Sequence, residues 1–103
     1  MIRIIVIYGQ PADPEAFDRH YAEVHTPLTL KMPLLKGFEV SKGAIAVAGS
    51  AAPAWLTAIL SYESEADAEA SFASEEGKAA AADLANFASG GVQLLTCKMQ
   101  ALL

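Results

Sequence analysis

The sequence is poor in the residues that most often hold metals and disulfides. It has one cysteine, Cys97, and two histidines, His20 and His25, among 103 residues. A single cysteine excludes an internal disulfide and a thiolate metal cluster, and it fits a reducing compartment. On a regular α-helix the two histidines would diverge by about 140°, so they do not form a metal-binding pair. We therefore expect neither a metal site nor a tightly bound cofactor.

Charge is also sparse, because Asp, Glu, Lys and Arg make up only 18% of the chain. The seven Lys and Arg residues are scattered and the net charge is -5, so nucleic acid and anionic membranes are poor partners. No apolar run approaches the roughly 20 residues of a spanning helix, and the N-terminal apolar run is too short for a signal peptide. A phosphate-binding loop and a Gly-x-Ser-x-Gly elbow are absent as well. We expect a cytoplasmic protein.

Apolar residues make up 53% of the chain, and their spacing predicts an alternation of strands and helices. Strands are expected over residues 2–8, 38–42, 55–62 and 92–99, with the second extended over 44–47 and a loop over 43–53. Asp13 and Ser64 are suited to cap helices over 14–25 and from 65 onward. Gly77 is expected to break the second helix, and Gly90 and Gly91 to end it.

The order β-α-β-β-α-β predicts a single domain, residues 1–103, of the α+β class. This is the ferredoxin-like arrangement, a four-stranded antiparallel sheet with both helices on one face. The other face should then be polar, yet Ile5, Ile7, Ile59 and Leu95 lie on it. We expect a homodimer in which two such faces meet and the sheets close into a barrel. The alternative is a larger core within one chain.

The stretch FDRHYAEVHTPL, residues 17–28, combines a helical pattern with a proline that should interrupt it. Pro27 has no N–H and crowds the carbonyl of Glu23, so the helix is expected to break at Thr26-Pro27. Thr26 would cap a new turn that ends at Pro33. His25 falls at this break, four residues after Tyr21 and within its reach. His20 is expected to be a solvated flank residue.

His25 is therefore a candidate for the rim of a cavity between helix and sheet. An imidazole there could move a proton near neutral pH. Phenol donors from Tyr21, Tyr8 and Tyr62, and the flat wall of Trp55, would suit a small apolar molecule with a carbonyl or phenol group. The alternative is that His25 only satisfies the broken helix end, and that the tyrosines are core residues.

Several segments together resemble one family, EthD, which is named for a component of ethyl tert-butyl ether degradation. They are IYGQP, FDRHYAEVHTPL, LLKGFEVSKG, YESEADAEASFAS and DLANFASGGVQL. The most specific part is the aromatic-x-x-x-His-x-Pro-Leu motif formed by Tyr21, His25, Pro27 and Leu28. The resemblance implies a dimeric α/β barrel of ferredoxin-like subunits. It also favours His25 as a site residue.

The resemblance implies a broad range of activities. EthD-like proteins accompany oxidative breakdown of ethers and other small organic compounds, and are often labelled oxidoreductases. The wider superfamily includes cofactor-free monooxygenases, isomerases, cyclases and haem enzymes, so the fold does not select among them. Relatives often carry a Pro-His pair in the second half of the second helix, where this chain has Glu75 and Glu76. If that histidine matters, the activity here differs or is absent.

Two hypotheses follow. In the first, the protein is an enzyme of an oxidoreductase or proton-transfer type. His25 is the general acid or base, Tyr21 orients it or the substrate, and Tyr8, Trp55 and Tyr62 bind a small hydrophobic catabolite. In the second, it is a non-catalytic binding or accessory protein of an oxidative degradation pathway.

Overall fold

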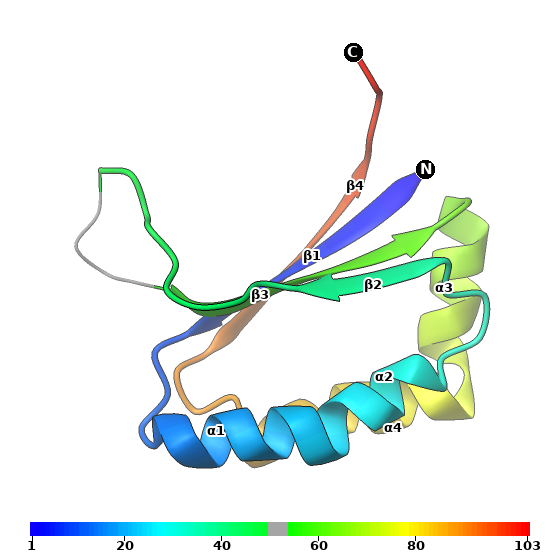
Figure 1. Ribbon diagram of the computed structural model, residues 1–103. Helices are drawn as coiled ribbons and strands as arrows, with labels where there is room; N and C mark the ends of the chain where they lie inside the picture. Colours follow the sequence, from blue (N-terminus) through cyan, green and yellow to red (C-terminus); the bar gives the residue numbers. More distant parts are fainter. Residues whose placement is uncertain (50–53) are drawn as a thin grey trace.

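In the computed structural model, four antiparallel strands form one sheet, and the described helices cover one of its faces (Figure 1). The structure describes residues 1–49 and 54–103, so residues 50–53 of the expected 43–53 loop lie outside the described residues. The strands are β1 (Ile2–Gly9), β2 (Gly37–Val40), β3 (Ala54–Tyr62) and β4 (Val92–Lys98). Their order is β2-β3-β1-β4, with every neighbouring pair antiparallel. The predicted α+β, ferredoxin-like class is confirmed.

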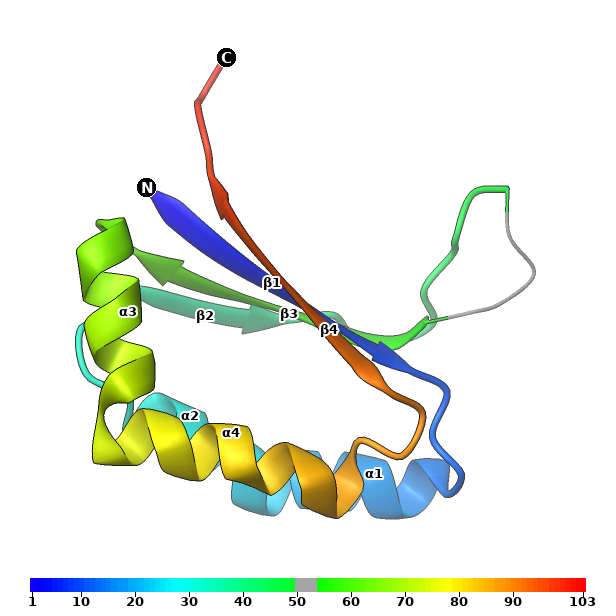
Figure 2. The ribbon, with the colours of Figure 1, turned by 180° about the vertical axis from the view of Figure 1, so that it is seen from behind.

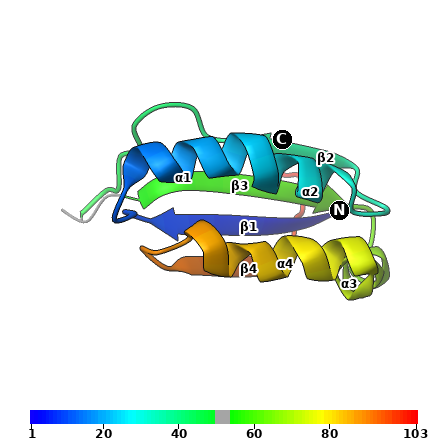
Figure 3. The same cartoon turned by 90° about the horizontal axis from the view of Figure 1, so that it is seen from below.

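The helical layer consists of two helical segments that lie side by side and a third that is steeply inclined to them (Figure 1). Its elements are α1 (Pro14–His20), η1 (Tyr21–His25), α2 (Thr26–Leu30), α3 (Glu65–Ala73) and α4 (Glu75–Phe87). Seen from behind and from below, α1, η1 and α2 follow one another in a single rod that lies beside α4 (Figures 2 and 3). At one end of this layer α3 rises toward the sheet (Figures 1 and 2). The rod and α4 therefore lie side by side on the same face of the sheet (Figures 1 and 3).

Alternation in β1 selects the face that the helices cover. Its even-numbered residues, Ile2 to Tyr8, are buried, and the odd-numbered ones are half-buried. The buried set packs against residues of β3 and of the helices, namely Ala58, Leu60, Tyr62, Phe17, Tyr21 and Phe87. Burying one large apolar side chain contributes about 1.5–3 kcal/mol, so this layer is the main source of stability.

Side-chain caps fix where the helices begin. Asp13 accepts a hydrogen bond from the Ala16 N–H, and Ser64 accepts one from the Asp67 N–H, as expected. The break in the second helix lies at Ser74, not at Gly77 as expected. Ser74 has extended backbone and its hydroxyl accepts from the Gly77 N–H, so a cap begins α4 there. Gly77 lies inside the first turn of α4 instead.

The prediction that the second strand extends over residues 44–47 was wrong. β2 ends at Val40, and residues 44–47 form no strand. The Ser41 N–H still donates to the carbonyl of Thr57 over 2.8 Å, which continues the pairing for one residue. Gly43 then adopts a φ of 82°, a left-handed value that turns the chain away from the sheet.

The second face of the sheet carries apolar side chains that the described residues leave partly uncovered. Ile5 pairs with Ile59 on one side and Leu95 on the other, so three branched apolar residues lie in one row. Ile7 is next to this row, and Leu95 is 46% exposed. We call this surface the open face. Its composition is the one that the sequence predicted.

Candidate functional site

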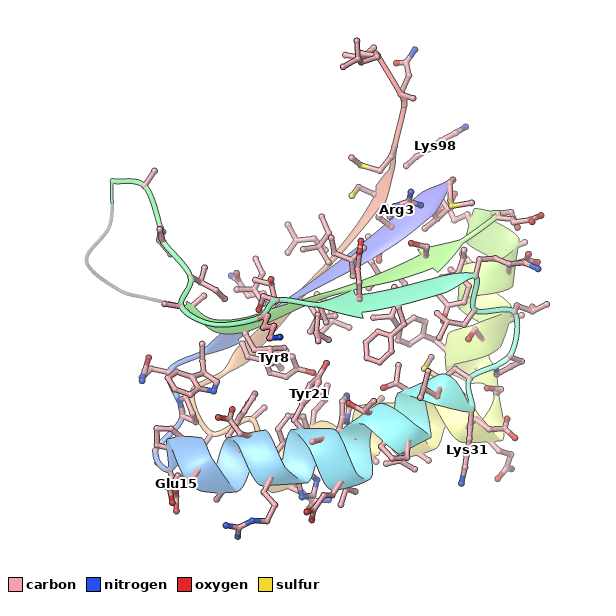
Figure 4. The ribbon with its side chains drawn as sticks, in the orientation of Figure 1. Arg3, Tyr8, Glu15, Tyr21, Lys31 and Lys98 are labelled. Carbon is pink, nitrogen blue, oxygen red and sulfur yellow. The ribbon has the colours of Figure 1, made fainter. Side chains whose placement is uncertain are left out.

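Tyr8 and Tyr21 meet between the sheet and the helical rod. Tyr8 lies near the C-terminal end of β1, and Tyr21 begins η1. The two side chains point toward each other (Figure 4). Their ring centroids are 5.6 Å apart in an edge-to-face arrangement, and both side chains are buried. Phe87 packs on both rings from α4. This aromatic cluster forms one wall of the site and fixes the ring positions.

A π-helical turn, rather than a break, precedes Pro27. Across η1 the Thr26 N–H donates to the carbonyl of Tyr21, five residues earlier. Thr26 has helical φ and ψ angles, so it does not cap a new helix, and the expected break is corrected to this turn. Pro27 cannot donate to Glu23, which lowers the cost of departing from regular α-helical bonding here. The Thr29 hydroxyl donates to the His25 carbonyl over 3.1 Å.

The π-turn changes which side chains share a face. On a regular α-helix His20 and His25 would diverge, but bonding between residues five apart brings them to the same side. His20 is therefore not a solvated flank residue. Its ring stacks on Phe87 with centroids 5.0 Å apart, and the ring of His25 lies 4.8 Å from the same phenyl group.

Both histidines contact one carboxylate, that of Asp83 on α4. The Nε2 atom of His20 lies 2.8 Å from Oδ1, and the Nδ1 atom of His25 lies 3.0 Å from Oδ2. Asn86 donates to Oδ1 over 3.0 Å. Asp83 is only 6% exposed. These donors replace the water that a buried carboxylate loses.

The environment assigns a charge to each group. Burial lowers the pKa of His25 below its ordinary value of 6.5 and outweighs the opposing effect of Asp83. Burial alone would raise the pKa of Asp83, but hydrogen bonds from Asn86, His20 and His25 hold that pKa below its usual range. At neutral pH His25 is therefore a neutral imidazole beside a carboxylate.

The hydrogen bond to Asp83 selects the tautomer of His25. Its Nδ1–H donates to Oδ2, so the lone pair of the ring lies on Nε2. The hydroxyl of Tyr8 is 3.5 Å from Nε2, a long contact that engages the lone pair weakly. Burial raises the pKa of Tyr8 far above its usual range and that of Tyr21 to about 12. Both phenols therefore remain hydrogen-bond donors.

A small cavity of about 50 Å³ lies between these groups and the sheet. It is lined by Tyr8, Tyr21, His25, Thr29 and mainly apolar residues, among them Val6, Met32, Phe38, Leu60, Phe72, Leu84 and Leu94. This volume accommodates one or two water molecules. A larger ligand would need the wall to move, and Phe72 and Leu84 in that wall are only half-buried.

The structure brings together three of the residues expected at the site, His25, Tyr21 and Tyr8. Trp55 is elsewhere: its indole N–H donates to Asp18 on α1 over 2.9 Å, and it lines a separate surface cavity. Tyr62 is fully buried, with its hydroxyl 2.8 Å from the hydroxyl of Ser71, and it does not line the cavity beside His25.

Sequence reasoning missed Asp83 and the position of His20. The signal for Asp83 was present, because it lies three residues after Ala80 and four before Phe87, on the buried stripe of α4. An acid on an apolar stripe needs a buried partner. His20 could not be placed without knowing the π-turn, which no simple periodicity reveals.

Some expectations concern groups outside the cavity. Glu75 and Glu76 are exposed at the start of α4 and are not among the lining residues of the cavity beside His25.

Over residues 1–49 and 54–103, no three His, Cys, Asp or Glu side chains are placed to hold a metal ion. Within the same residues no helix has the length and apolarity needed to span a membrane.

The fold and site define a class, a ferredoxin-like α+β chain with a buried His-Asp pair beside a cavity. The EthD domain model matches residues 9–91, so the chain belongs to the EthD family. It is 47% identical over 95 residues to an uncharacterised 11.0 kDa protein of the thcB-thcC intergenic region in Rhodococcus erythropolis. That match covers 92% of this chain and 91% of the relative.

Solved structures agree with this assignment. An EthD family protein from Bacillus halodurans is 29% identical, with a TM-score of 0.87 over 97% of this chain and 99% of the other. A ferredoxin-like protein from Bacteroides fragilis, described as dimeric, is 16% identical, with a TM-score of 0.66 over 95% of each chain. SnoaB, a cofactor-independent oxygenase from Streptomyces nogalater, is 11% identical, with a TM-score of 0.69 over 98% and 95%. The last two show a common fold.

Proposed function

We propose that the protein is a catabolic enzyme that moves a proton on a small, mainly apolar compound, with His25 as general base. The observation that carries the proposal is the buried, neutral imidazole of His25. Its Nδ1–H is held by Asp83, and its Nε2 lone pair lies beside Tyr8 in the wall of the cavity. This is the arrangement of a base whose tautomer and orientation are fixed by a carboxylate.

The reaction this geometry supports is removal of a proton from a carbon next to a carbonyl group, or from a phenol. Nε2 of His25 takes the proton, and Asp83 stabilises the imidazolium that results. Tyr8 and Tyr21 donate hydrogen bonds to the substrate oxygen, where negative charge develops. The apolar remainder of the wall suits an apolar substrate body.

An oxidative role uses the same first step. An enolate or phenolate gives electrons to dioxygen more readily than its conjugate acid, so deprotonation by His25 would begin an oxidation without a cofactor. SnoaB is described as a cofactor-independent oxygenase, and the EthD family is named for ether degradation. These two descriptions support the proposal that the protein takes part in the oxidative breakdown of small compounds.

Deuterium exchange tests the proton-transfer step directly. A panel of small cyclic and aromatic ketones in D₂O would be followed by NMR for loss of the proton next to the carbonyl. The wild type should accelerate exchange for at least one ketone, and His25→Asn should be slower by about a hundredfold or more. Glu23→Gln, an exposed change in the same turn, is the matched control and should exchange at the wild-type rate.

The outcome separates catalysis from binding. Equal exchange in a folded His25→Asn variant would remove the catalytic role. A non-catalytic carrier is the second candidate, favoured by the mainly apolar wall of the cavity. It predicts ketone-induced chemical-shift changes at Tyr8 and Tyr21 in both proteins, with no exchange above the solvent rate in either.

We also propose that two copies associate through the open face. The row formed by Ile5, Ile59 and Leu95 is apolar and partly uncovered. Arg3 lies on the same side of β1 (Figure 4), and its Nη1 atom is shielded from solvent without a hydrogen-bond partner among the described residues. An acceptor from a second copy would satisfy that atom. The dimeric description of the Bacteroides fragilis protein supports this arrangement.

A further inference from the structure

Asp83 is shared between two imidazole rings at a single oxygen atom. Its Oδ2 atom lies 3.0 Å from Nε2 of His20 and 3.0 Å from Nδ1 of His25. Its Oδ1 atom contacts the same Nε2 of His20 at 2.8 Å and accepts from Asn86. His20 therefore makes two of the four side-chain contacts to the carboxylate, although nothing in the proposed reaction uses it.

The two rings differ in their access to water. The side chain of His20 is 26% exposed, whereas that of His25 is 8% exposed. Both pack on Phe87, so neither can turn away from Asp83 without losing an aromatic contact. The cluster thus has an outer imidazole, a central carboxylate and an inner imidazole.

We propose that His20 is a positioning residue that acts on His25 through Asp83 and keeps the inner ring in its neutral, basic form as the solution becomes acidic. The proposal rests on the proposed role of His25 as a base. A positive charge on the outer ring would be offset by the shared carboxylate of Asp83, and the inner ring would then lose its stabilising partner.

One buried negative charge can offset only one imidazolium ion. His20 retains contact with water when it becomes charged, so its desolvation cost is smaller than that of His25. A second positive charge in the same buried cluster is then disfavoured, so a charge on one ring opposes a charge on the other. Burial is the main reason that the pKa of His25 is lowered, and the charge of His20 acts in the same direction.

Within residues 1–49 and 54–103, the other titratable groups that face the cluster do not oppose this coupling. Tyr8 faces His25 from β1 and Tyr21 faces it from η1, and burial keeps both phenols neutral. From α4 the facing groups are Asp83 and the uncharged amide of Asn86. Among the described residues, no Lys or Arg side chain forms a salt bridge with the cluster.

NMR titration of the imidazole ring protons tests the proposal without a substrate. In the wild type the ring of His25 should stay neutral to a pH below its ordinary pKa of 6.5. In His20→Gln, which removes the outer charge, the midpoint of His25 should rise by about one pH unit. Arg19→Gln is the matched control, because it removes an exposed positive charge from the neighbouring position and should leave the midpoint unchanged.

Two results would overturn the inference. One is an unchanged His25 midpoint in a folded His20→Gln variant. The other is visible without any variant, namely a wild-type titration midpoint of His25 at or above its ordinary value of 6.5. Because these measurements need no turnover, they remain informative if His25 is not catalytic. If ketone exchange is observed, the acid limit of its pH profile should move to higher pH in His20→Gln.

Discussion

At the scale of single residues, Asp83 organises the site. It occupies a position on the buried stripe of α4 that a small apolar residue would fill without cost, yet it carries a carboxylate with donors from His20, His25 and Asn86. Removing the donors one at a time leaves a buried charge partly unpaired, which is more costly than losing an exposed ion pair. Because the charges of His25 and Asp83 depend on pH, the free energy of unfolding should depend on pH as well.

The free energy of unfolding should fall as the pH drops below about 6.5. The pKa of His25 is lowered in the folded protein, so below its ordinary value the unfolded chain binds more protons and gains stability relative to the fold. The pKa of Asp83 is also lowered, so its stabilising contribution is complete above about 3.8 and is lost as the pH falls through the folded value. Urea unfolding at a series of pH values measures both steps.

His25→Asn separates the contributions, because asparagine keeps a donor near Asp83 but does not titrate in this range. The variant should lose the part of the pH dependence that begins near 6.5 and keep the part at lower pH. A wild type whose unfolding midpoint is constant between about pH 7.5 and pH 5 would contradict the assignment of His25 as a buried neutral ring.

At the scale of elements, the junction of α3 and α4 depends on one close approach. A Cβ atom on Gly77 would collide with the carbonyl oxygen of Ser71 and lie 2.7 Å from the Cα atom of Phe72. Gly77→Ala should therefore destabilise the protein by about 1–3 kcal/mol, because backbone atoms must shift, although alanine is the better helix former. Chemical denaturation measures the change.

Ala79→Gly is the matched reverse change on the exposed side of the same helix. It should cost about 1 kcal/mol through helix propensity alone. If Gly77→Ala is as stable as the wild type or more stable, then the close approach does not limit α4, and propensity decides at this position as well. Movement of Phe72 in Gly77→Ala should also alter the cavity wall, visible as shifts of the Tyr21 ring resonances.

The elements show where sequence reasoning succeeds and where it stops. Alternation in β1 and the caps at Asp13 and Ser64 are local signals, and the structure agrees with them. Gly77 was misread because a glycine that breaks a helix and a glycine that allows a close approach are identical in sequence. The position of His20 depends on a π-turn stabilised by contacts with α4, which are distant in the chain.

At the scale of the whole molecule, the open face is the largest feature that one copy leaves unexplained. The described helices lie on the opposite face of the sheet (Figure 1), so residues 1–49 and 54–103 leave this face partly uncovered. Ile5→Glu should split or unfold a dimer, because an unpaired buried charge costs several kcal/mol. Sedimentation and circular dichroism together distinguish dissociation from unfolding.

Leu30→Glu is the control, because Leu30 is 64% exposed on α2, in the helical layer that covers the opposite face of the sheet. It should leave both the sedimentation coefficient and the fold unchanged. The thermal midpoint of the wild type should also rise with protein concentration, as association requires. A wild type that sediments as a stable monomer at micromolar concentration would refute the dimer.

The π-turn also determines how sequences of this family should be aligned. A π-turn holds one residue more than the α-helical turn it replaces, so it is an insertion hidden inside a helix rather than in a loop. A one-residue gap between Tyr21 and His25 would restore regular bonding and leave the flanking segments on their original faces. A relative with such a gap would therefore have a histidine that points in a different direction, and so a different site. In a sequence alignment the same change would look like a minor deletion.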